Sequence, residues 1–330
     1  MICQNWTLHL LGIASLASVA LAQPSQRPTI SVGTTRSSQY HWCGTDEGND
    51  HLGGEDDLVA LEALSKRSLD TENPIGRKNP IKIPVNIFLV GTEEQRGELK
   101  ENSALLQIED ALAEGYSQHG IFFGPIETYQ VAGDEYVNVN HSERKFRQTL
   151  DMKEGLRIGG AETLNVYVVP KLDRGTLGYA VFPWILSTYT DERALAMDGV
   201  VLGYWGLKHF LSRKAIVHEV GHFLGLLHPF QGGCKSLDGD SIPDTPQATY
   251  VSQHCEPKDT CPQLPGHDLI KNYMMYSACS EDLSFTPGQV SRMREAWYKW
   301  RDPQTRKLTY LTSEPIRTTP NSTMIVTKFC

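Results

Sequence analysis

Residues 218–228, HEVGHFLGLLH, decide the fold and the chemistry of this chain. His218 and His222 are four positions apart. On a helix they would lie one turn apart on the same face, with Cβ atoms roughly 5–6 Å from each other, which lets two imidazoles bind one metal ion. Glu219 follows the first histidine directly and points about 100° around the helix. It can therefore reach a water on that metal without being a ligand, as a general base does.

Gly225 and His228 extend this string into a complete metal site. Glycine readily adopts positive φ, so Gly225 is expected to end the helix and let the chain bring His228 back toward the metal. Three neutral histidines leave the fourth position of a tetrahedral Zn²⁺ open to water, which is the arrangement of a catalytic site. A bare HExxH can arise by chance, whereas the added glycine and third histidine make the longer string far more specific. We therefore expect one catalytic Zn²⁺.

The extended string is the metzincin signature, and a second motif supports that resemblance. Residues 272–276, NYMMY, are similar to the methionine turn that follows the zinc helix in metzincins. The resemblance implies that Met274 lies beneath the zinc and that Tyr276 lies near it, where its hydroxyl can stabilise an oxyanion. Met275 stands where the most similar metzincins have aspartate, which removes the hydrogen bond that an aspartate would make.

Further segments are similar to the pappalysin-like metzincins, also called cytophagalysins, and in particular to their fungal extracellular members. The similarity extends from about residue 81 to residue 295. It implies a metzincin-like zincin domain of α/β class, with a mixed twisted sheet, an active-site helix and a loop-rich, disulfide-stapled C-terminal subdomain. It also implies a secreted zinc-dependent endopeptidase that acts on proteins or peptides. The segments are LNVY at 164–167, LGYA at 177–180, DGVV at 198–201, FQGGC at 230–234, DTP at 244–246 and FTPGQ at 285–289.

The hydrophobic pattern predicts where strands and helices lie around the motif. Strands are expected at 81–90, 121–131, 164–169, 177–182 and 199–204, and helices at 102–119, at 213–225 and from Thr286 onward. Thr286 begins the last helix as N-cap, with proline at N1 and Gln289 at N3 of a capping box. A peptide substrate is expected to pair with an edge strand at 177–182.

Composition limits the partners of the chain. With 330 residues, of which 40% are hydrophobic and 21% charged, it can bury one substantial core. Its formal net charge of −8 disfavours nucleic acid and anionic membranes as partners. We expect a monomer. A zinc-binding module without turnover and a disulfide-rich interaction protein remain alternatives, although an intact Glu219 argues against the first.

The N-terminal region predicts secretion and processing. An apolar run at residues 10–22 ends in Ala-Leu-Ala, an A-x-A cleavage pattern, so residues 1–22 are expected to form a signal peptide. The run is too short to cross ~30 Å of hydrocarbon. Residues 23–79 are polar and resemble a pro-segment with dibasic pairs at 66–67 and 77–78, which leaves residues 80–330 as the catalytic domain.

Six cysteines remain after the signal peptide, an even number that favours disulfides in an oxidising compartment. The resemblance implies the pairs Cys234–Cys261 and Cys255–Cys279. Cys43 is then open to two interpretations. Its Cys-Gly sequence resembles the cysteine switch that blocks zinc in related precursors, whereas a Cys43–Cys330 disulfide would use up every cysteine.

Two further kinds of site are expected on the surface. Asp238, Asp240 and Asp244 cluster after the zinc motif, and carboxylates at this density can bind Ca²⁺ or simply form an acidic, solvated loop. The sequons at Asn140 and Asn321 are candidate N-glycosylation sites.

Overall fold

The computed structural model describes the part of the chain that contains the expected catalytic domain. Its described residues are 79–101, 104–132, 138–139, 143–172, 176–188, 191–204, 207, 212–236, 238–249, 254–304 and 325–328. The expected signal peptide, nearly all of the expected pro-segment, and Cys43, Asn140, Asn321 and Cys330 lie outside these residues. Within the described residues, every helix is too short or too polar to cross a bilayer.

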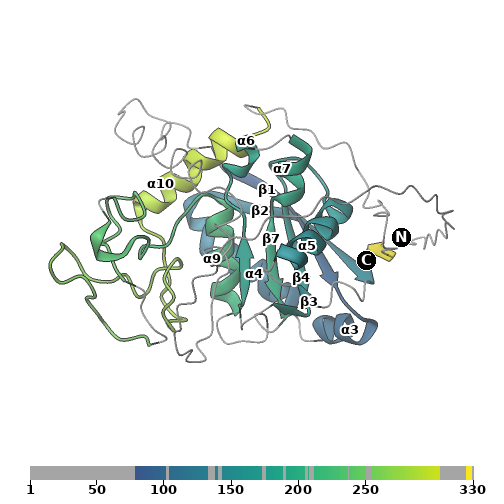
Figure 1. Ribbon diagram of the computed structural model, residues 1–330, viewed down its shortest axis with the longest axis horizontal. Helices are drawn as coiled ribbons and strands as arrows, with labels where there is room; N and C mark the ends of the chain where they lie inside the picture. Colours follow the sequence, from purple (N-terminus) through teal and green to yellow (C-terminus); the bar gives the residue numbers. More distant parts are fainter. Residues whose placement is uncertain are drawn as a thin grey trace, which may run out of the picture.

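A six-stranded, mostly parallel sheet forms the centre of the molecule (Figure 1). The strand order is β6-β7-β4-β1-β2-β8. The four inner strands run parallel, and the two edge strands, β6 and β8, run antiparallel to their neighbours. In chain order the strands are β1 (Ile81–Val90), β2 (Ile121–Ala132), β4 (Leu164–Val169), β6 (Gly178–Ala180), β7 (Val200–Gly203) and β8 (Ile325–Lys328).

Helices cover both faces of this sheet, which explains why its central strands β4 and β7 are buried on both sides. Every residue of β4 and β7 is buried. On one face, alternate residues of β1 such as Ile87 and Leu89 pack with residues of α4 (Ala104–Tyr116) and α9 (Ser212–Phe223). On the other face, Phe88 and its neighbours pack with residues of α5 (Glu143–Leu156).

Shorter elements complete this layered core. They are α3 (Glu93–Glu101), the 3₁₀ turn η1 (Ser117–His119), α6 (Ile185–Thr188), α7 (Asp191–Met197), the 3₁₀ turn η4 (Gly233–Lys235), and a small parallel pair, β3 (Asn138–Val139) with β5 (Lys171–Leu172). The helix α10 (Pro287–Ala296) runs directly into a π-helical turn, η5 (Trp297–Arg301). Trp297 and Trp300 of that turn are buried.

The loop-rich region between α9 and α10 lies beside the sheet, in green to yellow-green on the left of Figure 1. Apart from η4, its described residues contain no regular helix or strand. Disulfides Cys234–Cys261 and Cys255–Cys279 cross-link it, with Cα–Cα distances of 5.5 and 4.8 Å. The two pairs are those that the resemblance implied, and the mixed α/β class is confirmed.

The expected elements agree closely with the observed ones. All five expected strands are present, although β6 is only three residues long. The expected 102–119 helix is α4 followed by η1 and ends at Gly120, whose φ is 71°. Thr286 caps α10 with the full capping box, because its side chain accepts from the Gln289 backbone while the Gln289 side chain accepts from the Thr286 backbone.

Candidate active site

The zinc-motif helix α9 ends in a Schellman motif that redirects the chain. Gly225 has a φ of 89°, its N–H donates to the His222 carbonyl at 2.8 Å, and the Leu226 N–H donates to the Gly221 carbonyl at 2.9 Å. This pair of bonds is the 5→2 and 6→1 pattern of that motif. The turn directs the following residues back along the helix, so that His228 meets the two helical histidines.

The three histidines converge on one point. Each pair of Nε2 atoms among His218, His222 and His228 is 3.1 Å apart, and all three side chains are buried. Zn–N bonds of ~2.0–2.1 Å in a tetrahedron would place the nitrogens about 3.3–3.4 Å apart, so the triangle fits a zinc ion closely. Among the described residues, this is the one group of three or more His, Cys, Asp or Glu side chains arranged to hold a metal.

Backbone carbonyls orient two of these rings. The Nδ1 of His218 lies 2.8 Å from the Tyr273 carbonyl, and the Nδ1 of His222 lies 2.7 Å from the Leu226 carbonyl. A carbonyl can only accept, so each Nδ1 carries the proton and each Nε2 is left as a metal ligand. Burial lowers the pKa of His218 well below its usual value, with smaller effects from the other two histidines. The ring is therefore neutral, as a zinc ligand must be.

The methionine-turn segment packs directly beneath the histidines. Met274 is fully buried, and a Cβ built on Gly221 would lie only 2.5 Å from its sulfur, so the zinc helix can approach the turn only because residue 221 is glycine. The ring of Tyr276 packs edge-on against His228, with centroids 4.8 Å apart. Phe230 stacks on His228 at 4.6 Å.

Glu219 lies against the edge strand of the sheet. It is 1% exposed, and a Cβ built on Gly178 of β6 would come within 3.0 Å of the Glu219 Cγ. The expected base and the expected substrate-binding strand are therefore neighbours. Because β6 pairs with β7 on one side only, its other side is an edge of the sheet.

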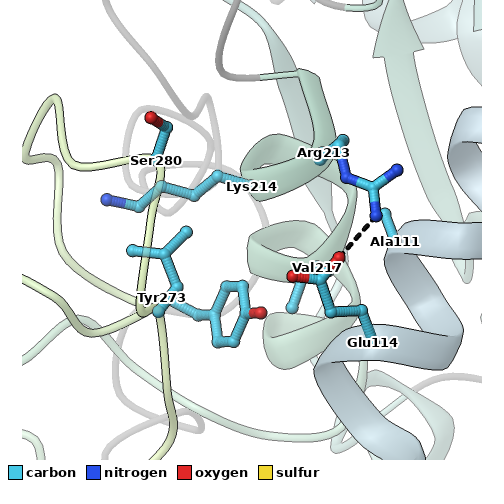
Figure 2. Close-up of a pocket in the computed structure, with 8 residues that line it drawn as sticks. Ala111, Glu114, Arg213, Lys214, Val217, Tyr273 and Ser280 are labelled. Carbon is cyan, nitrogen blue, oxygen red and sulfur yellow. Dashed lines mark hydrogen bonds and ion pairs between the residues drawn. The ribbon is translucent and has the colours of Figure 1, made fainter.

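A small pocket lies behind the zinc helix, between α4 and the methionine turn (Figure 2). Its volume is about 50 Å³, and its lining includes Tyr273, whose carbonyl orients His218. In Figure 2, Arg213 reaches toward Glu114 on α4, whereas Lys214 extends toward the loop that carries Ser280. The buried Lys214 ammonium donates to both the carbonyl and the hydroxyl of Ser277 at 2.9 Å. Burial lowers the pKa of Lys214 to about 7.

Comparisons with known proteins agree with this geometry. The sequence pattern of peptidase family M43, described as pregnancy-associated plasma protein-A, matches residues 160–297. An extracellular metalloprotease of Verticillium alfalfae is 36% identical over 259 residues, which cover 74% of this chain and 88% of the relative. One of Podospora anserina is 30% identical over 303 residues, covering 88% and 97% of the two chains. The chain belongs to the pappalysin family, M43.

Solved structures show the same fold. Mature mirolysin of Tannerella forsythia, in complex with a cleaved peptide, matches this pappalysin with a TM-score of 0.54 at 23% identity and covers 69% of this chain and 94% of its own. A promirolysin variant matches with a TM-score of 0.59 at 20% identity, covering 78% and 94%. Family membership and the histidine triad together support a metalloprotease whose metal is zinc.

The three aspartates after the zinc motif have separate roles in this pappalysin. Asp238 is exposed. Asp240 is buried, and its Oδ1 accepts from the Ile242 N–H at 3.1 Å and the Thr245 hydroxyl at 2.6 Å. Asp244 caps α10, with one oxygen accepting from the Thr286 hydroxyl and the other from the Gly288 N–H, both at 2.7 Å. They do not form a three-carboxylate cluster among the described residues.

Sequence analysis missed a buried ionic cluster that supports the end of the zinc helix. Arg301 donates to the Phe223 carbonyl at 3.0 Å and forms a two-point ion pair with Asp198 at 2.7 and 2.9 Å. Arg157 contacts the same carboxylate at 3.2 Å, and all three side chains are fully buried. Burial raises the pKa of Asp198, but Arg301 and then Arg157 outweigh it, so the net shift is downward. A positive charge at the C-terminal end of a helix also interacts favourably with the helix dipole and so stabilises the helix.

Proposed function

We propose that this pappalysin is a secreted zinc-dependent endopeptidase that hydrolyses protein and peptide bonds, with Glu219 as general base. The observation that carries the proposal is the buried 3.1 Å triangle of histidine Nε2 atoms, with Glu219 one residue from the first ligand and against an edge strand. A structural zinc site has no need of an adjacent carboxylate or of an open fourth position.

The residues around the triad have separate roles in the reaction. Bound zinc would lower the pKa of a water toward ~7 and polarise the scissile carbonyl. The Glu219 carboxylate would accept a proton from the attacking water and donate it to the leaving amine. Tyr276, whose ring packs against His228, donates a hydrogen bond to the oxyanion that develops.

The substrate lies extended along β6. Backbone pairing at an edge strand binds a peptide whatever its side chains are, which suits a protease that acts on proteins. Gly178 supports this placement, because a residue without a side chain keeps the strand close to Glu219.

Metal analysis together with digestion of casein or gelatin tests the function. Hydrolysis that disappears with a chelator and returns with zinc would support the endopeptidase. Stoichiometric zinc without hydrolysis of either protein, in protein freed of its pro-segment, would indicate a binding module instead.

The N-terminal segments belong to the same proposal. We infer that residues 1–22 direct secretion and that residues 23–79 keep the precursor inactive, and the extracellular names of the relatives are consistent with secretion.

A sulfur held in a disulfide is no longer a thiolate that can bind zinc, so Cys43 cannot serve both as zinc switch and as the disulfide partner of Cys330. We propose the cysteine switch. A Cys43–Cys330 peptide in mass spectra of the unreduced precursor would exclude it.

Calcium binding in the loop that carries Asp238, Asp240 and Asp244 is a further proposal, and Asp240 is the residue that would bind the ion. Its Oδ2 is buried without a hydrogen-bond partner among the described residues, and burial raises its pKa to about 7. A divalent cation would offset the cost of keeping this carboxylate charged. A calcium-dependent rise in melting temperature that Asp240→Asn abolishes would support it, and an unchanged melting temperature would exclude it.

A further inference from the structure

The methionine turn carries three features of the active site on four consecutive residues. The Tyr273 carbonyl orients His218 at 2.8 Å, the Met274 sulfur lies beneath Gly221, and the Tyr276 ring packs against His218 and His228. A small shift of this backbone would therefore disturb both a zinc ligand and the proposed oxyanion donor.

This turn lies in a loop and not in a helix or strand. Among the described residues, its backbone N–H groups donate to few carbonyls outside it: Tyr273 donates to Ser284 at 3.2 Å and Asn272 to Leu269 at 2.8 Å, whereas the bond from Met275 to Asn272 at 3.1 Å lies within the turn. Side chains from neighbouring helices must therefore contribute to its position. Two such side chains reach it, one at each end.

Gln289 of α10 holds the N-terminal end. The side-chain amides of Gln289 and Asn272 form two hydrogen bonds with each other. The Gln289 nitrogen donates at 3.1 Å and its oxygen accepts at 2.7 Å, and both residues are buried. The Asn272 oxygen also accepts from the Met274 N–H at 2.9 Å, which shapes the turn. The Gln289 oxygen accepts in addition from the Thr286 N–H at 2.9 Å, so the capping box of α10 fixes the orientation of the amide that holds the turn.

Lys214 of the zinc helix holds the C-terminal end. It lies one helical turn before His218, and its ammonium donates to the carbonyl and hydroxyl of Ser277, the residue after Tyr276. Ser277 in turn donates to the Ile270 carbonyl. The helix that supplies two zinc ligands is thereby tied to the far end of the turn.

We propose that Gln289 and Lys214 are positioning residues that fix the methionine turn, and through it His218 and Tyr276. The part that concerns Tyr276 rests on its proposed role in oxyanion stabilisation. The Gln289 amide bonds to Asn272 and the Lys214 ammonium bonds to Ser277, so both side chains act on the active site through the turn. Loss of either anchor is expected to loosen zinc and to lower kcat more than it changes KM.

Gln289→Met and Lys214→Met remove the anchors with little change in side-chain length. Two control variants match them: Thr286→Val removes the hydroxyl of the helix cap but keeps the amide pair and the Thr286 N–H that orients it, and Arg213→Met removes the neighbouring cation from the same turn of α9. The mature enzyme is measured in three ways. A chromogenic chelator reports the rate of zinc release, steady-state kinetics give kcat and KM, and thermal unfolding gives the melting temperature. The anchor variants are expected to release zinc ~10–100-fold faster, as loss of outer-shell partners does elsewhere.

The controls are expected to lose thermal stability without faster zinc release. If Gln289→Met fails to fold, Gln289→Glu replaces it, because glutamate keeps the acceptor but loses the donor. If Lys214→Met fails to fold, Lys214→Arg replaces it. In a Tyr276→Phe background the anchor variants should lower kcat by a smaller factor than in the wild type, because the part of their effect that passes through Tyr276 is already lost. Zinc release equal to that of the controls would overturn the proposal. An inactive wild-type enzyme would instead defeat the proposed function, and zinc release would still decide the anchors.

Discussion

Replacing Gly225 with alanine tests how the chain brings His228 to the metal. The φ of 89° at Gly225 costs an L-residue ~1–2 kcal/mol. The new Cβ would lie 2.9 Å from the Cβ of Ala296, and such overpacking costs about 1–3 kcal/mol. Alanine also lowers the conformational entropy of the unfolded chain, which offsets ~0.4–1 kcal/mol of this loss in stability. The free energy of unfolding is therefore expected to fall by about 2–4 kcal/mol.

Thermal unfolding followed by circular dichroism measures this loss. For a domain of this size, 1 kcal/mol corresponds to about 2–4 °C, so the melting temperature should fall by roughly 5–15 °C. Zinc should also dissociate faster, because the Leu226 carbonyl that orients His222 follows this turn directly.

Gly97 of α3 provides the matched control, because a Cβ there meets nothing within 4 Å. Gly97→Ala should stabilise the protein by about 0.5–1 kcal/mol, as alanine does inside a helix. Equal melting temperatures for Gly225→Ala and Gly97→Ala would refute the argument from the Schellman turn.

Three further variants test other parts of the site. His228→Ala leaves two protein ligands and should lose zinc during dialysis against a mild chelator; full retention would show that the third ligand lies elsewhere. Gly178→Ala should displace the Glu219 side chain and lower kcat while zinc is retained. An unchanged kcat would show that β6 does not help to position the general base. Asp198→Asn leaves Arg301 buried without its partner and should cost about 3–5 kcal/mol in urea unfolding; a loss below ~1 kcal/mol would contradict the packing described.

Local features of this pappalysin could be predicted from its sequence because their partners are near in the chain. The zinc string, the terminating Gly225 and the Thr286 capping box each depend on residues within a few positions of one another. Strong apolar runs likewise identified β1 and β4 with their bounds. The disulfide pairs and the methionine turn needed the resemblance, since spacing alone left their partners open.

Long-range polar contacts could not be predicted, because the hydrophobic periodicity of a segment does not indicate which distant residue its polar side chains will contact. Arg301 and Asp198 are 103 positions apart, and Lys214 and Ser277 are 63 apart. The helix α5 has a polar sequence with few apolar residues, so its pattern gave little signal although Met152 and Leu156 are buried against the sheet. The aspartates after the zinc motif were grouped by proximity in sequence, whereas the fold gives Asp240 and Asp244 different partners.

The most direct test of the proposed mechanism is the Glu219→Gln variant, measured for zinc content and peptide hydrolysis in the same sample. The amide keeps the shape of the side chain but cannot accept the proton from water. The mechanism predicts zinc equal to that of the wild type, with hydrolysis reduced by at least about 10²-fold. Near wild-type turnover by the zinc-loaded variant would contradict the role of Glu219 as general base.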